Sequence, residues 1–181
     1  HYKFINIEVG GYGKQSDGGT FKASSLYKRL MDNELNLPKD ELFEGSENPM
    51  PYVITADEAY PLLKHLLKPY SKKDLDSDKE YFNKRLSRAR RTVECAFGII
   101  NSKWELLQRP IATDVKLADS IVKAICILHN TIIDMEGMDH NLINFEVNKA
   151  RSVSRGRSIE EAKQIRNSFK EYLCENPLFY D

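Results

Sequence analysis

Residues 80–107 read EYFNKRLSRARRTVECAFGIINSKWELL, and this stretch carries the strongest periodicity in the chain. Its apolar residues recur in steps of three and four, which keeps one side of a helix facing inward. They are Phe82, Leu86, Ala89, Val93, Phe97, Ile100, Trp104 and Leu107. The pattern predicts one long helix that begins near Glu80, buries Val93 and Phe97, and is stopped by Pro110.

Two strands and a helix are predicted before this long helix. Residues 2–9 alternate apolar and polar side chains, as a half-buried strand does. The glycine-rich turn that follows is expected to present Asp17 on a loop. A helix capped by Thr20 is expected to run to about Asn33. Residues 52–56 form a short β-branched run that is typical of a buried strand.

Three further helices are predicted. A short one is expected over residues 59–67. After the long helix, residues 117–135 are apolar nearly all round, which predicts a helix that lies beneath other elements and is closed by Gly137. Residues 138–157 lack periodicity and are typical of a flexible connector, whereas residues 159–173 predict a final amphipathic helix. Strands alternating with helices place the chain in the α/β class.

The composition indicates an intracellular globular protein and does not identify a binding partner. The chain has 181 residues, enough for one domain with a core. Its 27 Lys and Arg residues balance 27 Asp and Glu residues, so no charge excess announces a nucleic-acid ligand. Cys95, Cys126 and Cys174 predict neither a disulfide framework nor a zinc ribbon, which favours a reducing intracellular setting. The most apolar stretch, residues 121–133, is too short to span a membrane. The first residues do not have the pattern of a secretory signal peptide.

Three acidic residues stand where a metal site can be built. Asp17 follows the first predicted strand, Asp57 follows the second, and Glu94 lies in the middle of the long helix. Carboxylates are hard oxygen ligands of the kind that Mg²⁺ prefers. Each acid also has a structural interpretation: Asp17 as a turn residue, Asp57 as a helix cap, and Glu94 as the partner of an arginine one turn away.

Three sequence blocks carry a resemblance to a known family. They read GGYGKQSDGGTF at 10–21, ADEAYPL at 56–62 and FNKRLSRARRTVECAFGII at 82–100. A fourth block, IVKAICILHN at 121–130, resembles the helix that follows the acidic helix in the same family. On these blocks, residues 1 to about 136 resemble the Harbinger-type (PIF/Harbinger) transposase-derived DDE nucleases.

The resemblance implies a fold, a reaction and a set of ligands. It implies a ribonuclease H-like mixed sheet with flanking helices, and hydrolysis of DNA phosphodiesters with two divalent cations, Mg²⁺ or Mn²⁺. Carried over residue by residue, Asp57 and Glu94 are the expected catalytic metal ligands, and Asp17 is an assisting ligand. The first catalytic aspartate of the family lies on a strand upstream of residue 1, so the N-terminal strands are expected to be missing from this chain.

Basic residues concentrate on the helix that bears Glu94. They are Lys84, Arg85, Arg88, Arg90 and Arg91. A solvated face with compensating acids is the structural interpretation; contact with the DNA backbone is the functional one.

Two functions therefore stay open at this point. One is a metal-dependent DNA endonuclease in the nucleus, acting with DNA and with a separate DNA-binding protein. The other is a truncated or domesticated relative that binds DNA or protein without cleaving. Residues 1–136 are expected to form a partial nuclease domain, followed by a connector and helix over 137–181. His129 and Asn130 are expected to be satisfied polar groups of a core, not a catalytic pair.

Overall fold

The computed structural model describes residues 1–11, 14–137 and 160–178, and its longest element is the helix that the sequence predicts most strongly. Helix α3 runs over Ser77–Lys103 and is followed by the 3₁₀ turn η2, Glu105–Gln108. The described residues group into two compact units. Of these residues, unit 1 holds 1–11, 14–15 and 91–137, and unit 2 holds 16–90 and 160–178. The predicted boundary at residue 136 stays a prediction.

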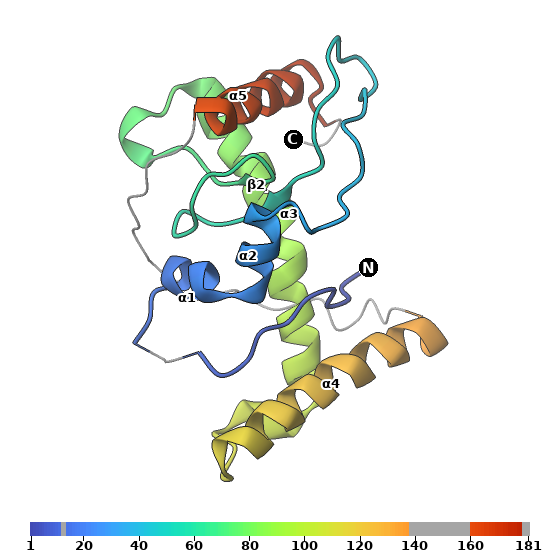
Figure 1. Cartoon of the computed structure of the whole chain (residues 1–181). Helices are drawn as coiled ribbons and strands as arrows, with labels where there is room; N and C mark the ends of the chain where they lie inside the picture. Colours follow the sequence, from blue (N-terminus) through green and yellow to red (C-terminus); the bar gives the residue numbers. More distant parts are fainter. Residues whose placement is uncertain (12–13, 138–159, 179–181) are drawn as a thin grey trace. The chain divides into compact units, whose positions relative to one another are not determined.

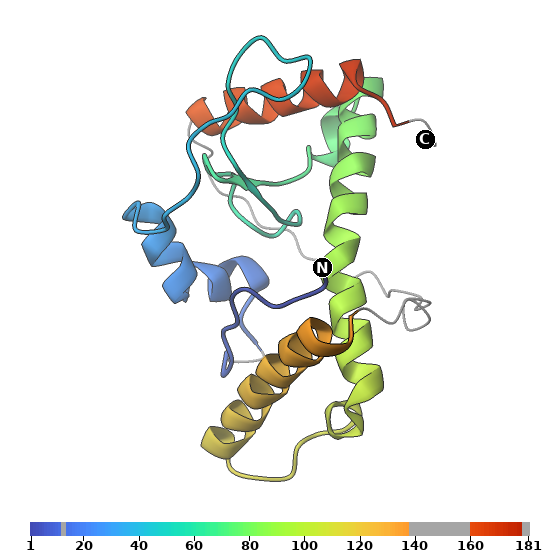
Figure 2. The same cartoon turned by 90° about the vertical axis from the view of Figure 1, so that its right-hand side faces the viewer.

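Unit 2 contains the sheet, which is small and parallel. Strand β1, Ile54–Thr55, pairs with β2, Leu66–Leu67, with Ile54 opposite Leu66 and Thr55 opposite Leu67 (Figure 2). The strand predicted over residues 52–56 is confirmed in a shorter form. The helix predicted over 59–67 is wrong, because this segment turns back and places its last residues in the sheet.

The first helix of unit 2 is divided in two. Helix α1, Asp17–Ala23, and helix α2, Ser25–Met31, meet at Ser24, whose backbone is extended. The buried Ser24 hydroxyl accepts a hydrogen bond from the Tyr27 N–H at 3.0 Å and so caps α2. The single helix predicted from Thr20 is therefore wrong, and Asp17 is the first residue of a helix instead of a loop residue.

Helix α5, Glu160–Glu175, packs against the N-terminal half of α3 in unit 2 (Figure 1). Phe82 is fully buried in this core, with Tyr70 edge-on at a ring separation of 5.3 Å. The Tyr70 hydroxyl donates to Asn167 Oδ1 at 2.6 Å, and the Arg166 guanidinium lies 3.9 Å from the Tyr70 ring centre. The predicted C-terminal helix is thus confirmed as an ordered part of unit 2. The predicted connector over 138–157 lies outside the described residues.

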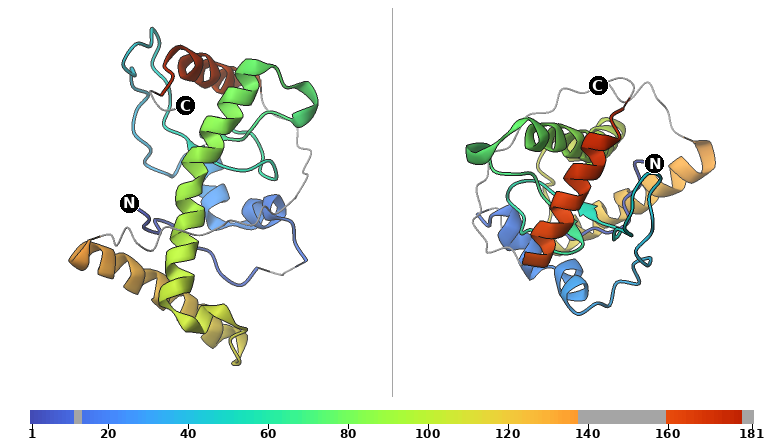
Figure 3. Two further views of the ribbon diagram at one scale, coloured as in Figure 1. Left: turned by 180° about the vertical axis from the view of Figure 1, so that it is seen from behind. Right: turned by 90° about the horizontal axis from the view of Figure 1, so that it is seen from above.

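Unit 1 is built on helix α4, Val115–Glu136, which contacts the C-terminal half of α3 (Figure 3). Asp114 caps its start, and Gly137, at a φ of 78°, ends it as predicted. The buried residues of α4 are Ile125, Cys126 and His129. The prediction that α4 lies beneath other elements is wrong for its other side, where Ile127 and Leu128 are exposed.

The strand predicted over residues 2–9 does not form. Its backbone is held by side chains of α4: the Phe4 N–H donates to Asn130 Oδ1 at 2.9 Å, and Asn130 Nδ2 donates to the Phe4 carbonyl at 2.7 Å. His129 Nε2 lies 2.9 Å from the Tyr2 carbonyl oxygen. Side chains therefore satisfy backbone groups that a neighbouring strand satisfies in a sheet. The prediction that His129 and Asn130 are satisfied core groups is confirmed.

The buried stripe of α3 shifts along the helix. Phe82 and Leu86 are buried, but Val93 and Phe97 are 55% and 58% exposed, so their predicted burial is wrong. The buried residues in this later part of α3 are instead Cys95, Ala96, Ile99 and Ile100. Cysteines 95, 126 and 174 are free thiols. None of the described helices is both long and apolar enough to cross a bilayer.

Candidate metal centre

Asp57 lies just beyond β1, on a turn that fixes one of its two carboxylate oxygens. The Ala56 N–H donates to the Leu67 carbonyl at 2.8 Å, which extends the pairing of the two strands up to this turn. Asp57 Oδ1 accepts a hydrogen bond from the Ala59 N–H at 2.8 Å. Asp57 therefore caps a turn and not the helix that was predicted after it. Its second oxygen, Oδ2, lies 3.7 Å from Arg90 Nη2 on α3.

Lys68 stabilises the turn that carries Asp57 by hydrogen bonds to its backbone. Lys68 Nζ donates to the carbonyl oxygens of Glu58 and Tyr60, each at 2.8 Å. Burial lowers the pKa of the Lys68 ammonium, and the nearby carboxylates of Glu58 and Asp57 oppose that shift. The Tyr60 N–H also donates to the Asp57 carbonyl at 3.3 Å. These hydrogen bonds stabilise the backbone conformation of the turn that carries the Asp57 side chain.

Asp17 is brought to the same part of unit 2 by α1. The Phe21 ring of α1 packs against the Tyr60 ring at 5.2 Å, which joins α1 to the Asp57 turn. The pKa of Tyr60 is raised, first by burial and then by the charges of Asp57 and Asp17, whereas Arg90 lowers it. Tyr60 thus lies in the part of unit 2 that holds the Asp57 turn, Arg90 and helix α1, and this group of residues is called the Asp57 cluster below.

Glu94 belongs to unit 1, and the structure describes it there. It lies on α3, half-buried, one helical turn after Arg90 and therefore on the same side of that helix. Of the three predicted metal ligands, Asp17 and Asp57 belong to unit 2 and Glu94 belongs to unit 1, and their shared ligation stays a prediction. Within the described ranges, no three His, Cys, Asp or Glu side chains lie together as a metal site.

Each aspartate supplies the carboxylate oxygens that a hard divalent cation prefers. Mg²⁺ is commonly held by one or two protein carboxylates, with water and substrate phosphate completing its coordination. The Asp57 side chain is about one third exposed, so its carboxylate can be reached from solvent. Two carboxylates on fixed backbone, with an open side, are a donor set for Mg²⁺ or Mn²⁺ and not for a thiolate-bound metal.

Tyr60 and Lys68 complete the cluster and were not identified as site residues from the sequence. Tyr60 lies inside the ADEAYPL block that carries the family resemblance, so the motif held a signal for it. Lys68 gave no such signal, because its role depends on how the backbone of residues 57–60 folds back over β2. Its part in the site is visible only in three dimensions.

The predicted DNA-binding residues of α3 fall into two groups. Lys84, Arg88 and Arg91 are exposed and follow one side of the helix at intervals of four and three residues. Arg85 instead donates to the Tyr81 hydroxyl at 2.9 Å and to the Asn176 carbonyl at 3.3 Å. Arg90 faces Asp57. The five basic residues therefore have different surroundings, and their contact with DNA stays a prediction.

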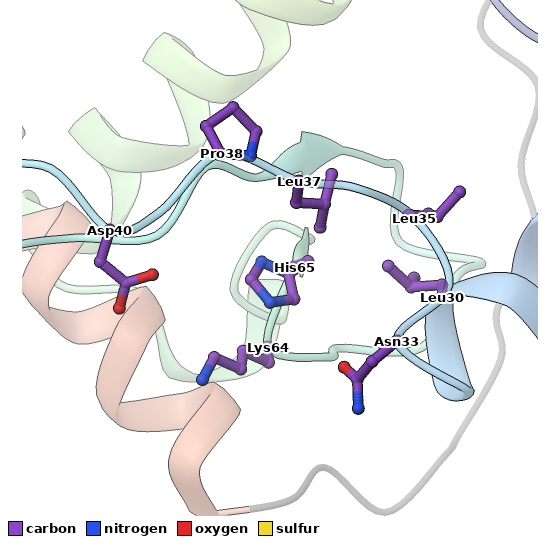
Figure 4. Close-up of a pocket in the computed structure, with 8 residues that line it drawn as sticks. All are labelled: Leu30, Asn33, Leu35, Leu37, Pro38, Asp40, Lys64 and His65. Carbon is purple, nitrogen blue, oxygen red and sulfur yellow. The ribbon is translucent and has the colours of Figure 1, made fainter.

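A pocket of about 210 Å³ lies elsewhere in unit 2 (Figure 4). It is lined by Leu30, Asn33, Leu35, Leu37, Pro38, Asp40, Lys64 and His65. Lys64 forms an ion pair with Glu161 at 3.2 Å, and His65 Nδ1 lies 3.0 Å from the Tyr52 carbonyl. These polar groups already have structural partners, and no predicted ligand lines the pocket. The candidate metal centre is therefore placed at the aspartates.

The chain is similar to two plant proteins. The chain is 28% identical over 178 residues to Protein ALP1-like of Arabidopsis thaliana, an alignment that covers 95% of this chain and 43% of the relative. It is 25% identical over 133 residues to Protein Antagonist of Like Heterochromatin Protein 1 of the same plant, with coverage of 73% and 33%.

The chain thus spans less than half the length of these curated relatives. No solved structure matches it. Residues 1–130 match the family described as DDE superfamily endonuclease, a range that includes Asp17, Asp57 and Glu94. The chain therefore belongs to the DDE superfamily endonucleases, which confirms the predicted kinship with Harbinger-type, transposase-derived nucleases.

Proposed function

We propose that the protein containing this chain is a divalent-metal-dependent DNA endonuclease of transposase descent, with Asp17, Asp57 and Glu94 as its metal ligands. The observation that carries the proposal is the position of Asp57 directly after β1, where the Ala59 N–H fixes Oδ1 at 2.8 Å and the carboxylate stays one third exposed. Membership of the DDE superfamily endonucleases supports the same residues. The place of Glu94 in the set rests on that membership.

Each residue of the cluster has a task that follows from its contacts. The Ala59 N–H orients Asp57 by holding Oδ1, while Oδ2 lies 3.7 Å from Arg90 Nη2. Tyr60, whose pKa is raised, stays protonated near neutral pH and is a hydrogen-bond donor there. Divalent cations bound by the three carboxylates would activate a water and stabilise the leaving oxygen of the phosphodiester. The ribonuclease H-like fold implied by the resemblance is part of this proposal.

The exposed basic side of α3 would bind the DNA backbone. Lys84, Arg88 and Arg91 are solvent-exposed and lie on the helix that carries Glu94. Positive charge beside a phosphate-cleaving centre attracts DNA, with an affinity that falls steeply as salt rises. Arg85 and Arg90 are secondary candidates for the same contact. We place this activity in the nucleus, with a separate protein supplying recognition of the DNA sequence.

A second function is favoured by the relatives. The name of one relative describes an antagonist of a heterochromatin protein, and no reaction is part of that name. On this alternative, the chain is a domesticated module whose basic side still binds DNA or a partner protein, while hydrolysis is lost. Both functions use the same surface of α3.

Nicking of supercoiled plasmid separates the two functions. We expect the complete protein to convert plasmid to the open-circular form in Mg²⁺ or Mn²⁺ and to stop when EDTA is added, because the carboxylates alone cannot activate water. Gel electrophoresis measures the conversion, and gel-shift with labelled DNA in EDTA measures binding. DNA binding without nicking in either metal would favour the binding module and reject the endonuclease.

A further inference from the structure

Helix α4 has a covered side and an exposed side in unit 1. On the covered side, Ile125 and Cys126 are buried with Ile100 of α3 (Figure 3). On the exposed side, Ile127 and Met135 are 64% and 81% exposed. Steps of three and four residues place seven side chains on this side, over about 27 Å of helix. We call them the α4 stripe: Leu117, Ser120, Ala124, Ile127, Leu128, Thr131 and Met135. A continuous exposed apolar surface of this kind is typical of a protein interface.

The two hydroxyl groups of the α4 stripe do not make it a polar surface. Ser120 Oγ donates to the Lys116 carbonyl at 2.9 Å, and Thr131 Oγ1 donates to the Ile127 carbonyl at 3.0 Å. Because the helix itself accepts both hydroxyl protons, covering the stripe leaves neither donor unpaired. Ala124 is small beside the larger Ile127, and such alternation of size allows two stripes to interdigitate. The stripe is therefore suited to contact another apolar helix.

The charges beside the α4 stripe indicate which helix that is. Lys116 and Lys123 are exposed in the N-terminal half of α4, and Asp134 is 60% exposed near its C-terminal end. Residues 116 and 134 are about five helical turns apart, so they lie on the same flank of the stripe. Opposite charges at the two ends of one flank are complementary to the same helix running in the opposite direction.

Two-fold symmetry brings these charges together. In a symmetric dimer, whatever one residue contacts in the second copy is contacted in return. Antiparallel pairing of two α4 helices therefore places Lys116 of each copy near Asp134 of the other. Asp134 also pairs with Lys3, but a carboxylate has two oxygens and accepts from more than one donor. Parallel pairing would place like charges beside one another, which is unfavourable.

We propose that the α4 stripe is a homodimer interface, which binds α4 of a second copy of this chain in the antiparallel direction. In the arrangement that pairs Lys116 with Asp134, Ala124 lies opposite Ile127 of the second copy, and Ser120 lies opposite Thr131. Small side chains then face larger ones along the stripe. This inference goes beyond the proposed function and depends neither on metal binding nor on DNA cleavage.

Self-association of the full chain tests the interface. Sedimentation velocity over a range of concentrations measures the dissociation constant of the dimer. We expect Ile127→Glu to raise this constant at least about 100-fold, because each copy would bury an unpaired charge. Val93→Glu makes a similar change at a 55% exposed apolar residue of α3, outside the stripe, and should dimerise as the wild type does. Circular dichroism confirms that each variant is folded.

Charge reversal tests the antiparallel direction. Lys116→Glu and Asp134→Lys are each expected to weaken self-association about tenfold at low salt, because symmetry turns two attractive pairs into two repulsive ones. An equimolar mixture of the two variants again pairs opposite charges at both ends of the interface. We therefore expect the mixture to form a dimer with about the wild-type affinity.

Several results would contradict the homodimer. A wild-type chain that stays monomeric at every concentration would overturn the proposal, and so would Ile127→Glu that dimerises as the wild type does. Single charge variants of wild-type affinity would overturn the antiparallel direction. A monomeric complete protein would also reject the dimer; protection of its Met135 from hydroxyl-radical oxidation would then show that another segment of the same polypeptide covers the α4 stripe.

Discussion

The Asp57→Asn variant of the complete protein is expected to nick plasmid DNA on the order of 10³-fold more slowly than the wild type in Mg²⁺. Asparagine keeps the size of the side chain and an oxygen that can accept from the Ala59 N–H, but it removes the negative charge that holds a cation. A bound metal stabilises the transition state by several kcal/mol, and each ~1.4 kcal/mol is tenfold in rate. Initial rates of open-circle formation measure the effect.

Two further variants make this result specific. Glu94→Gln is expected to match Asp57→Asn in size, because both carboxylates are proposed to bind the cations that carry the reaction. Glu58→Gln is the matched control: it removes the same charge from the adjacent residue, whose backbone carbonyl still accepts from Lys68. A loss in Glu58→Gln equal to that in Asp57→Asn would show that local charge matters and that ligation does not.

The second large effect concerns the core that supports the Asp57 turn. Phe82→Ala is expected to lower the free energy of unfolding by about 3 to 5 kcal/mol, the range found when a large buried side chain leaves a cavity. Phe82 is fully buried among Leu62, Leu67 and Tyr70, and Leu67 belongs to β2, which pairs with the strand before Asp57. Urea unfolding, followed by circular dichroism, measures the change.

Phe97→Ala is the control for this effect on the same helix. Phe97 is 58% exposed, and the centre of its ring lies 5.5 Å from the centre of the Phe4 ring. Its removal should therefore lower the free energy of unfolding by less than about 1.5 kcal/mol. A variant of Phe82 no less stable than the Phe97 variant would mean that the α3 and α5 core does not support unit 2 as described.

The helices of the chain could be predicted because their evidence is local. The steps of three and four in residues 82–107 and 159–173 require only a helix with one apolar side, and α3 and α5 form there. The strand over residues 2–9 had an equally local pattern and was wrong. Alternation says which side chains face inward, but a strand also needs a neighbouring backbone, and here Asn130 takes that place.

The candidate site could also be predicted only in part. Asp17, Asp57 and Glu94 could be nominated from short motifs, since each stands in a block with a family resemblance. The setting of Asp57 could not be predicted, because Arg90 and Lys68 reach it only after α3 and β2 have packed. The helix expected over 59–67 fails for a related reason: Lys68 binds carbonyl oxygens of residues 58 and 60 and so stabilises a turn there.

The proposal that the three carboxylates bind shared cations can be tested directly by affinity cleavage. Fe²⁺ occupies sites of oxygen ligands, and with ascorbate and peroxide it cuts the polypeptide backbone close to where it is bound. We expect mass spectrometry of the full chain to find cuts near residues 17, 57 and 94 together, all suppressed by excess Mg²⁺ and all lost in Asp57→Asn. Cuts near 17 and 57 that persist while the backbone around 94 stays intact would contradict a shared metal centre.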